Sequence, residues 1–377
     1  MSFNSFGFSP ELIKELENQN YTKPTPIQEM AIPSILKKKD LLGIAKTGSG
    51  KTASYVLPIL SNLKGHTEKV DRNVNVLVLV PTRELAVQVE EVFASFGRRL
   101  PYSFKSMAIF GGVSINPQMK RLRGVNVLVA TPGRLLELSR SNAMQLSSIK
   151  TLVLDEADKM LNLGFKKELD EILALLPKNR QNLLFSATLS PDVKNIESVL
   201  LKNPTVVQIE SPIEEYFLIN QTGYFVSKEK KGPLLRHLLK EKDIKQVLIF
   251  TSSVYQADQL TFKLRKHEIN ARAIHSKKSQ GARQEALTIF KAGKLNVLVT
   301  TDLLARGIDI EFLPYVINYE LPRSPKDFVH RIGRTGRAEN PGEAITFVTE
   351  EDKHHFRVIQ KKMKQWVTMI DSEKIFS

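Results

Sequence analysis

Short apolar runs, many of them rich in β-branched residues, are separated along this chain by polar turns and helix-length segments. The first set of runs comprises residues 41–44, 74–80, 125–130, 151–154 and 182–185. A continuous apolar run indicates a strand that is buried on both faces, and alternation with helices is typical of a parallel sheet covered by helices. The first half of the chain is therefore predicted to be an α/β domain.

The same pattern occurs again in the second half of the chain. Its apolar runs comprise residues 247–250, 271–274, 297–300, 316–319 and 344–348. Between the two sets, residues 208–215 hold one Pro, three acidic residues and no long apolar run, which is typical of a linker. We predict a first domain over residues 1–208, a linker over 209–216 and a second domain over 217–377.

The end of the chain shows a helical spacing of apolar residues. The residues with this spacing are Phe356, Ile359, Met363, Trp366, Val367 and Ile370. Such a stripe predicts a helix that packs on the second domain, and core packing is favoured for Trp366 over the alternative of a stacking platform. Lys361, Lys362 and Lys364 are then expected to face elsewhere, with RNA as a candidate partner.

The composition of the chain indicates what kind of partner it binds. The 377 residues carry a formal net charge of +15, shared between the two halves, which favours a polyanionic partner. The chain has no Cys, no apolar stretch long enough to cross a membrane and no N-terminal secretory pattern. We therefore expect a cytoplasmic protein that does not insert into membranes.

A glycine-rich segment follows the first apolar run, with the sequence Ala-Lys-Thr-Gly-Ser-Gly-Lys-Thr at residues 45–52. Gly48 and Gly50 let successive N–H groups turn toward phosphate oxygens, and Lys51 can reach the β- and γ-phosphates. The Thr52 hydroxyl can bind Mg²⁺. Ala45 stands where the usual phosphate-loop pattern begins with Gly, but the strand, loop and helix context is the one that the pattern requires.

An acidic pair follows the apolar run 151–154. Asp155 is placed at the carboxyl end of a buried parallel strand, where α/β sheets position ligands. We expect Asp155 to hold Mg²⁺ and Glu156 to polarise water. A phosphate loop and an acidic pair together predict a nucleoside triphosphatase.

An arginine cluster lies in the second half, where residues 330–337 read His-Arg-Ile-Gly-Arg-Thr-Gly-Arg. Arg331, Arg334 and Arg337 are three residues apart, so their guanidinium groups are expected to line one side of a turn or short helix. Arg forks complement phosphate and can stabilise charge on a transferred γ-phosphoryl group. The same cluster could instead bind RNA or form surface ion pairs.

Taken in order, these motifs resemble those of the DEAD-box ATP-dependent RNA helicases, and among them the minimal-core RhlE-type members. The matching segments are residues 24–28, 45–52, 81–86, 111–112, 131–134, 155–158, 186–188, 305–309 and 330–337. The resemblance implies two tandem RecA-like domains that use ATP and Mg²⁺.

The resemblance assigns a nucleotide site that spans both domains. It implies that Gln28 reads the adenine edge, that Tyr21 stacks on the ring and that Phe3 supports this loop. The phosphates and Mg²⁺ are assigned to Thr47, Gly48, Ser49, Gly50, Lys51, Thr52 and Asp155, and the attacking water to Glu156. From the second domain, Asp309 is assigned to the ribose and Arg334 and Arg337 to catalysis in trans. Asp158, Ser186, Thr188 and His330 are expected to couple the domains.

The resemblance also assigns RNA contacts, which are Arg83, Gly111, Gly112, Thr131, Gly133, Arg134, Thr251, Gln280, Arg283 and Thr301. These residue types contact phosphates and 2′-hydroxyls, so little dependence on base sequence is expected. The implied protein is a monomer that unwinds short RNA duplexes locally, with ribosomal or RNA-decay proteins as possible partners. Two alternatives stay open at this point, namely an ATP-gated RNA clamp or annealing protein and a DNA-directed P-loop ATPase.

Overall fold

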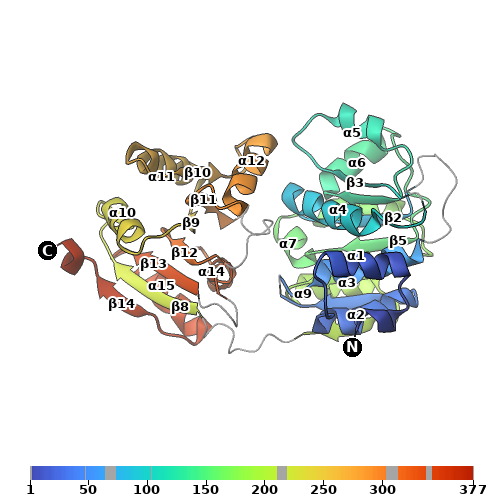
Figure 1. The fold of residues 1–377 in the computed structure, drawn as a ribbon, viewed down its shortest axis with the longest axis horizontal. Helices are drawn as coiled ribbons and strands as arrows, with labels where there is room; N and C mark the ends of the chain where they lie inside the picture. The colour runs from blue at the N-terminus through green and yellow to red at the C-terminus, as the bar shows by residue number, and fades with distance from the viewer. Residues whose placement is uncertain are drawn as a thin grey trace. The chain divides into compact units, whose positions relative to one another are not determined.

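The protein is described here from a computed structural model that covers residues 2–46, 48–63, 74–102, 104–209, 219–302, 313–336 and 342–376. The chain divides into two compact units, Met1–Ser211 and Pro212–Ser377. The predicted linker lies outside the described residues from position 210 onward. Each unit is an α/β fold with its own sheet, as the apolar pattern predicts (Figure 1).

Unit 1 contains a sheet of seven strands in the order β3-β4-β2-β5-β6-β1-β7, and every neighbouring pair is parallel. The strands are β1 (Leu41–Ile44), β2 (Val76–Leu79), β3 (Ser106–Ile109), β4 (Val127–Ala130), β5 (Thr151–Leu154), β6 (Gln181–Ser186) and β7 (Thr205–Gln208). The sheet is buried on both faces. Along β2, Val76 and Val78 enter one hydrophobic cluster, whereas Leu77 and Leu79 enter another.

Helices cover both faces of this sheet. The cluster with Val76 and Val78 includes residues of α1 (Pro10–Asn18), α2 (Pro26–Leu36), α3 (Lys51–Asn62) and α4 (Arg83–Gly97). The opposite cluster includes residues of α6 (Pro132–Arg140), α7 (Ala157–Asn162), α8 (Lys166–Leu175) and α9 (Pro191–Leu200). The short helices η1 (Phe3–Phe6) and α5 (Ile115–Arg121) complete the described helices of unit 1. The sequence predicts this layered arrangement correctly.

Unit 2 contains a second sheet of seven parallel strands, in the order β10-β11-β9-β12-β13-β8-β14. Its strands are β8 (Ile219–Phe225), β9 (Val247–Thr251), β10 (Ala271–Ile274), β11 (Val297–Thr301), β12 (Tyr315–Asn318), β13 (Gly342–Val348) and β14 (Thr368–Asp371). Its described helices are α10 (Lys231–Glu241), α11 (Val254–Lys266), α12 (Gln280–Lys291), α14 (Pro325–Ile332), α15 (Lys353–Met363) and α16 (Glu373–Phe376).

Four strands are absent from the sequence-based prediction, namely β3, β7, β8 and β14. Three of them form sheet edges. An edge strand is partly solvated, so its burial alternates, as in β3 and β7, and the continuous apolar run is missing. Strand β8 lies inside the sheet, but its sequence Ile-Asn-Gln-Thr-Gly-Tyr-Phe is too polar to resemble a buried strand.

The prediction for Trp366 is wrong. Phe356 and Ile359 are buried on α15 as expected, but α15 ends at Met363 and the chain then turns toward β14. Because the helical period stops before Trp366, its side chain is not on the buried stripe and is 70% exposed.

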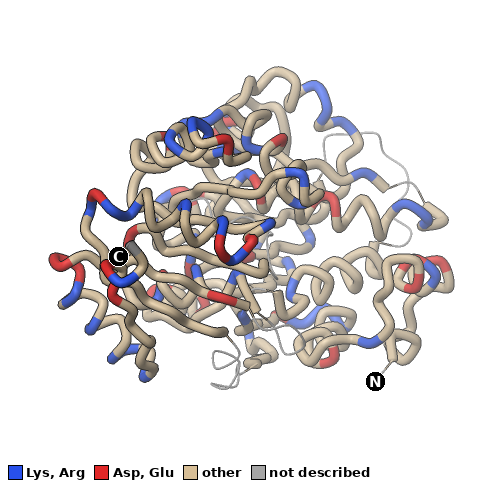
Figure 2. The backbone as a smooth tube through the Cα atoms, turned by 60° about the vertical axis from the view of Figure 1, so that its left-hand side comes forward, with Lys and Arg blue, Asp and Glu red and all other residues tan. Residues whose placement is uncertain are grey.

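Charge is distributed over both units, as the sequence indicates. Figure 2 shows Lys and Arg on both units, with Asp and Glu interspersed. None of the helices in the described segments has both the length and the apolar character that a bilayer crossing needs.

Candidate functional site

The carboxyl edge of the unit 1 sheet brings together the segments that follow its strands. The glycine-rich loop follows β1, Asp155 and Glu156 follow β5, and Thr188 lies just beyond β6. Strands β5, β6 and β1 are neighbours, so segments more than a hundred residues apart in the chain meet at one place. The segments after β3, β4 and β2 form the adjacent half of the same edge.

The glycine-rich loop has the backbone that its sequence predicts. Gly48 and Gly50 have φ of 77° and 92°, the left-handed region that favours glycine, and Gly50 is the N-cap of α3. Lys51 is the first residue of α3, and its buried ammonium donates to the Ala45 carbonyl at 2.5 Å. The Ser49 hydroxyl is buried and has no hydrogen-bond partner among the described residues. Thr47 lies outside the described residues.

Gln28 braces this loop. It is the N3 residue of α2, where its Oε1 accepts from the Thr25 N–H at 2.9 Å and closes a capping box. Its Nε2 donates to the Gly50 carbonyl at 3.2 Å, while the Thr25 hydroxyl donates to the Ser49 carbonyl at 2.8 Å. A Cβ at Gly50 would lie 2.6 Å from Gln28 Nε2, so the contact requires glycine. The side chain of Gln28 is therefore part of the loop as well as a candidate base reader.

The predicted aromatic support is present in unit 1. The rings of Phe3 and Tyr21 meet edge to face, with centroids 6.3 Å apart, and Tyr21 also contacts Phe96 at 5.4 Å. Phe3 is buried and Tyr21 is half-buried. Asn20, just before Tyr21, has a left-handed φ of 59°. Phe3 thus holds the segment that carries Tyr21, and Tyr21 keeps part of its surface accessible.

Asp155 is a buried carboxylate with a partner that the sequence does not reveal. Its Oδ2 accepts from the Tyr55 hydroxyl on α3 at 2.9 Å, and its Oδ1 accepts from the Glu156 N–H at 2.8 Å. Burial raises the pKa of Asp155, and the nearby Lys51 charge opposes that shift. Burial, together with the Asp155 charge, also raises the pKa of Tyr55 well above its usual value. Tyr55 therefore stays protonated and acts as a hydrogen-bond donor.

Glu156 has one paired and one unpaired oxygen. The residue has a left-handed φ of 53° and is the N-cap of α7. Its Oε1 forms an ion pair with Lys159 Nζ at 2.6 Å, and both side chains are more than nine-tenths buried. Its Oε2 is buried and finds no hydrogen-bond partner within the described segments. A buried carboxylate oxygen without a donor is suited to bind a water or a ligand proton.

Asp158, Ser186 and Thr188 form one hydrogen-bonded group beyond β5 and β6. Asp158 Oδ2 accepts from the Thr188 hydroxyl at 3.0 Å, and the Ser186 hydroxyl donates to the Thr188 carbonyl at 2.8 Å. These bonds connect the start of α7 to the segment after β6. Of the four residues predicted for coupling, the three in unit 1 are therefore linked through Thr188.

The unit 1 residues assigned to RNA gather at the other half of the edge. The left-handed Gly112 lies against the Arg83 guanidinium, and a Cβ there would come within 2.0 Å of Arg83. Arg134 is buried, with Nε donating to Glu137 at 2.7 Å and Nη2 donating to the Val113 carbonyl at 2.7 Å. Arg134 therefore holds the loop that carries Gly111 and Gly112. Thr131 is the buried N-cap of α6, and a Cβ at Gly133 would meet open space.

The corresponding residues of unit 2 lie at the ends of β9 and β11 and in the first turn of α12. Thr251 is buried and its hydroxyl donates to the Ser253 carbonyl at 3.2 Å, while Thr301 is the last residue of β11. Gln280 accepts a hydrogen bond from Arg283 on the first turns of α12. Since β10, β11 and β9 are neighbours, these residues also share one carboxyl edge.

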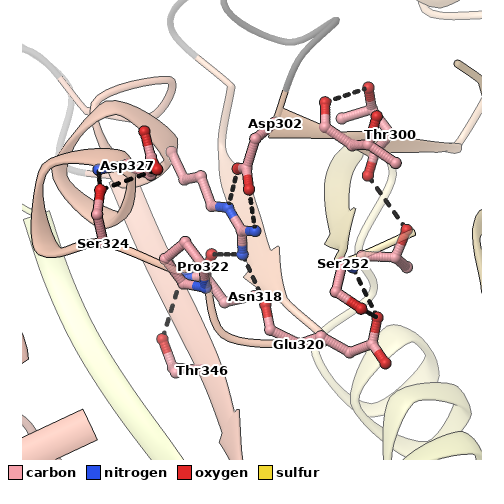
Figure 3. A network of polar contacts seen from close by, with 12 residues as sticks. Ser252, Thr300, Asp302, Asn318, Glu320, Pro322, Ser324, Asp327 and Thr346 are labelled. Carbon is pink, nitrogen blue, oxygen red and sulfur yellow. Dashed lines mark hydrogen bonds and ion pairs between the residues drawn. The ribbon is translucent and has the colours of Figure 1, made fainter. Parts of the chain in front are cut away.

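The arginine cluster is only partly as predicted. Arg331 is buried, and its Nε and Nη2 form a double ion pair with Asp302 at 2.5 and 2.8 Å (Figure 3). Its Nη1 donates to Asn318 at 3.2 Å and to the Glu320 carbonyl at 2.6 Å. The expectation that Arg331 lines a ligand-facing side is therefore wrong, because its N–H groups are used inside unit 2. Arg334 is buried and His330 is half-buried, whereas Asp309 and Arg337 lie outside the described residues.

Sequence reasoning missed Tyr55, Lys159 and Asp302, each of which contacts a residue that it had singled out. Tyr55 lies in an apolar helical run and is indistinguishable there from a core residue. Lys159, three residues after Glu156, had a detectable signal, because residues at that spacing face each other on a helix. For Asp302, 29 residues before Arg331, no local signal exists.

Comparisons with known proteins identify the family to which the chain is similar. A family described as DEAD/DEAH box helicase matches residues 25–196, and one described as helicase conserved C-terminal domain matches residues 230–339. ATP-dependent RNA helicase DeaD of Buchnera aphidicola subsp. Baizongia pistaciae is 38% identical over 99% of this chain and 61% of its own length. DEAD-box ATP-dependent RNA helicase CshA of Streptococcus pneumoniae is 39% identical over 97% of this chain and 69% of its own length.

Solved structures show the same fold. S. cerevisiae Dbp5 bound to RNA and ADP BeF3 has a TM-score of 0.85 at 31% identity, covering 98% of this chain and 96% of that chain. A DEAD box protein from Methanococcus jannaschii has a TM-score of 0.54 at 34% identity, covering 98% and 99% of the two chains.

Proposed function

This chain belongs to the DEAD-box helicase family, and on that premise we propose that it is an RNA-stimulated ATPase that unwinds short RNA duplexes locally. One observation carries the proposal. The glycine-rich loop with Lys51 lies at the same sheet edge as the buried side chains of Asp155 and Glu156. The pKa of Asp155 is raised by burial, and Glu156 has one carboxylate oxygen without a hydrogen-bond partner among the described residues. Phosphate binding and water activation thus have candidate groups at one place.

The proposed nucleotide contacts come mostly from unit 1. The N–H groups of residues 47–50 and the Lys51 ammonium would bind phosphates, with Lys51 leaving the Ala45 carbonyl for the ligand. The Gln28 amide has one N–H and one acceptor position beyond its two described hydrogen bonds, which suits an adenine edge. Tyr21 would stack on the base, supported by Phe3.

The Thr52 hydroxyl and the Asp155 carboxylate are hard oxygen donors, and they would hold a Mg²⁺ ion that neutralises phosphate charge. A carboxyl group binds a metal ion in its ionised form. Burial raises the pKa of Asp155 and works against ionisation, whereas the nearby Lys51 charge lowers this pKa and favours it.

Glu156 is the proposed acceptor of the water proton. Lys159 holds Oε1, so Oε2 is the oxygen left to orient a water. The water oxygen bonds to the γ-phosphorus as the bond to the bridging oxygen breaks, and the proton moves to Glu156. ADP and phosphate are the products. Lys159 is a positioning residue here, because it acts through Glu156.

The remaining assignments concern unit 2 and RNA. Arg334, Arg337 and Asp309 would complete the nucleotide site from unit 2, and His330 would act with Asp158, Ser186 and Thr188 to make hydrolysis depend on closure of the two units. Single-stranded RNA would bind across the two carboxyl edges through backbone and 2′-hydroxyl contacts. ATP and RNA would each favour closure, so each would raise affinity for the other. Unwinding is expected to be non-processive.

The first test measures ATP turnover with single-stranded RNA, with DNA of equal length and without nucleic acid. We expect stimulation by RNA alone and loss of turnover in Lys51→Ala. Equal stimulation by DNA would favour a DNA-directed ATPase. Unchanged turnover in Lys51→Ala would contradict the phosphate-loop assignment.

A second test separates a helicase from an ATP-gated RNA clamp. A short duplex with a labelled strand is incubated with ATP, and strand release is followed with the wild type and with Glu156→Gln. A helicase releases the strand, and Glu156→Gln is expected to remain bound to RNA and ATP. Binding without strand release by the wild type would favour the clamp or annealing function.

We also propose a cytoplasmic monomer, with ribosomal or RNA-decay proteins as partners.

A further inference from the structure

Helix α15 of unit 2 has an outward face that is basic. From Lys353 to Trp366 the chain has five Lys or Arg, two His and no Asp or Glu. None of these residues belongs to the ATP or RNA assignments above. Such a run of cations without an acid is an observation that the proposed function leaves unexplained.

Packing determines which side chains face outward. Phe356, Ile359 and Gln360 are buried against unit 2, where Phe356 contacts Phe328 with ring centroids 5.9 Å apart. The exposed residues then form two adjacent rows along the helix, which are Lys353, Arg357 and Lys361 in one row and His354, Val358 and Lys362 in the other. We call these six residues, with Lys364 and Trp366, the α15 surface (helix α15 is labelled in Figure 1).

Most cations of the α15 surface are not neutralised. Lys353 pairs with Glu350 at 2.6 Å. For Arg357, Lys361, Lys362 and Lys364, the described part of the chain provides no carboxylate within ion-pair distance. The helix macrodipole favours Lys361 and Lys362 in the last turn, but it disfavours Lys353 in the first turn. Helix stability therefore does not account for the whole set.

Trp366 is held outward by a hydrogen-bonded turn. Lys364 is the C-cap that follows α15 and has a left-handed φ of 55°, and the Gln365 N–H donates to the Gln360 carbonyl at 3.3 Å. On either side of Trp366, Gln365 accepts from Gln221 Nε2 at 2.8 Å, and the Val367 N–H donates to Gln360 Oε1 at 2.8 Å. Val367 is buried, so both neighbours are anchored while the indole is 70% exposed. An anchored turn that presents a large aromatic ring beside cations is an arrangement suited to base stacking next to phosphate contacts.

We propose that the α15 surface is an accessory site for single-stranded RNA, in which Trp366 stacks on a base and Arg357, Lys361, Lys362 and Lys364 contact phosphates. Stacking on an aromatic ring beside a basic track is how proteins bind single strands without sequence preference. The proposal rests on the proposed function only in taking RNA as the polyanion. Because β14 begins just after Trp366 and runs parallel to the other strands, Trp366 lies at the amino edge of the unit 2 sheet, so this site is separate from the RNA contacts proposed at the carboxyl edge.

The test uses Trp366 itself, because it is the only Trp in the chain. The emission of the full-length protein is followed while oligouridylate is added without nucleotide. We expect saturable quenching that weakens as salt is raised, since phosphate contacts release counterions. The same quenching is expected in Lys51→Ala, because the α15 surface does not include the ATP site. This variant therefore tests the accessory RNA site independently of whether the proposed ATPase function is correct.

Variants then test each part of the surface by the anisotropy of a labelled oligouridylate. Trp366→Ala is expected to weaken binding about tenfold, as loss of one stacked base would. Replacing Lys361 and Lys362 together by Ala should lower the slope of log affinity against log salt by about 1.4, at about 0.7 for each lost phosphate contact. The matched controls are Phe262→Ala and the pair Lys263→Ala with Lys266→Ala, since these exposed residues lie on α11 of the same unit. The controls should leave affinity unchanged.

Three outcomes would overturn the proposal. The first is an emission that does not respond to oligouridylate. The second is equal weakening by the α11 controls, which would indicate diffuse attraction by the net charge. The third is quenching by phosphatidylserine vesicles without any response to oligouridylate, which would make the surface a membrane contact.

Discussion

At the scale of single residues, Tyr55 is the side-chain hydrogen-bond donor to the buried Asp155. Its hydroxyl donates to the carboxylate at 2.9 Å, and this hydrogen bond lowers the pKa of Asp155 against the larger effect of burial. Tyr55→Phe removes the hydroxyl and leaves the buried Asp155 Oδ2 without this hydrogen-bond donor. We expect the free energy of unfolding to fall by about 1–3 kcal/mol and nucleotide affinity in the presence of Mg²⁺ to fall with it.

The measurement is urea unfolding together with nucleotide titration. Tyr102→Phe is the matched control, because Tyr102 donates to the Leu60 carbonyl at 2.5 Å and does not contact Asp155. The control should lose some stability but keep its nucleotide affinity. Equal loss of affinity in both variants would contradict a specific role for Tyr55.

The raised pKa of Asp155 also predicts a pH dependence. Because the folded protein holds the Asp155 proton to higher pH than the unfolded chain, this group stabilises the fold at low pH, and the contribution is lost as pH rises through the raised pKa. Asp155→Asn removes the titration. The stability of the variant relative to the wild type should therefore increase from about pH 4, near the ordinary carboxyl pKa, to neutral pH. Urea unfolding across this range tests the sign, and a difference that does not change with pH would refute it.

At the scale of elements, the hydrogen bonds of Gln28 connect the start of α2 to the glycine-rich loop. In Gln28→Glu, Oε1 can still accept from Thr25, but a carboxylate oxygen replaces the N–H that donates to Gly50. The carbonyl and the carboxylate then repel, so the loop should shift. We expect weaker binding of both ATP and GTP as well as a relaxed preference for ATP, measured by competition with a fluorescent nucleotide. A changed preference with unchanged total affinity would limit Gln28 to base reading.

The contact between α14 and the end of β11 depends on Arg331. Arg331→Met leaves Asp302 without its double ion pair and leaves the buried Asn318 without a donor. Breaking such a pair from one side costs about 3–5 kcal/mol. Arg272→Met is the control, because its ion pair with Glu285 is exposed and should contribute about 0–1 kcal/mol. The free energy of unfolding of both variants is measured by urea unfolding. Similar decreases would show that the buried ion pair stabilises the protein no more than the exposed one.

At the scale of the whole molecule, the proposed cycle requires residues from both units for hydrolysis. Arg334 belongs to unit 2, whereas Lys51, Asp155 and Glu156 belong to unit 1. Arg334→Ala should therefore reduce RNA-stimulated ATP turnover by about 10²-fold or more, as loss of a charge-stabilising Arg does, with little change in RNA affinity. Turnover and RNA anisotropy are measured on the same preparation. A loss confined to RNA affinity would assign Arg334 to the RNA contacts.

Much of this protein is predictable from local sequence. The central strands follow from continuous apolar runs, and the phosphate loop follows from glycines whose left-handed φ no other residue adopts as readily. The position of Asp155 at a strand end follows from the apolar run before it. These features depend on residues within a few positions of one another, so the sequence by itself determined the two α/β units, the order of motifs and the family resemblance.

Tertiary structure alone decided which residues meet. Tyr55 and Asp155 are a hundred positions apart and touch only because α3 follows β1 while β1 and β5 flank β6 in the sheet. Arg331 turned inward because the tertiary fold brings Asp302, just after β11, and Asn318, at the end of β12, to its guanidinium group. The edge strands β3, β7 and β14 escaped prediction because they are partly solvated, and Trp366 is exposed because α15 ends before it. Hydrophobic period and turn chemistry are local, whereas burial and pairing depend on strand order, which no local pattern records.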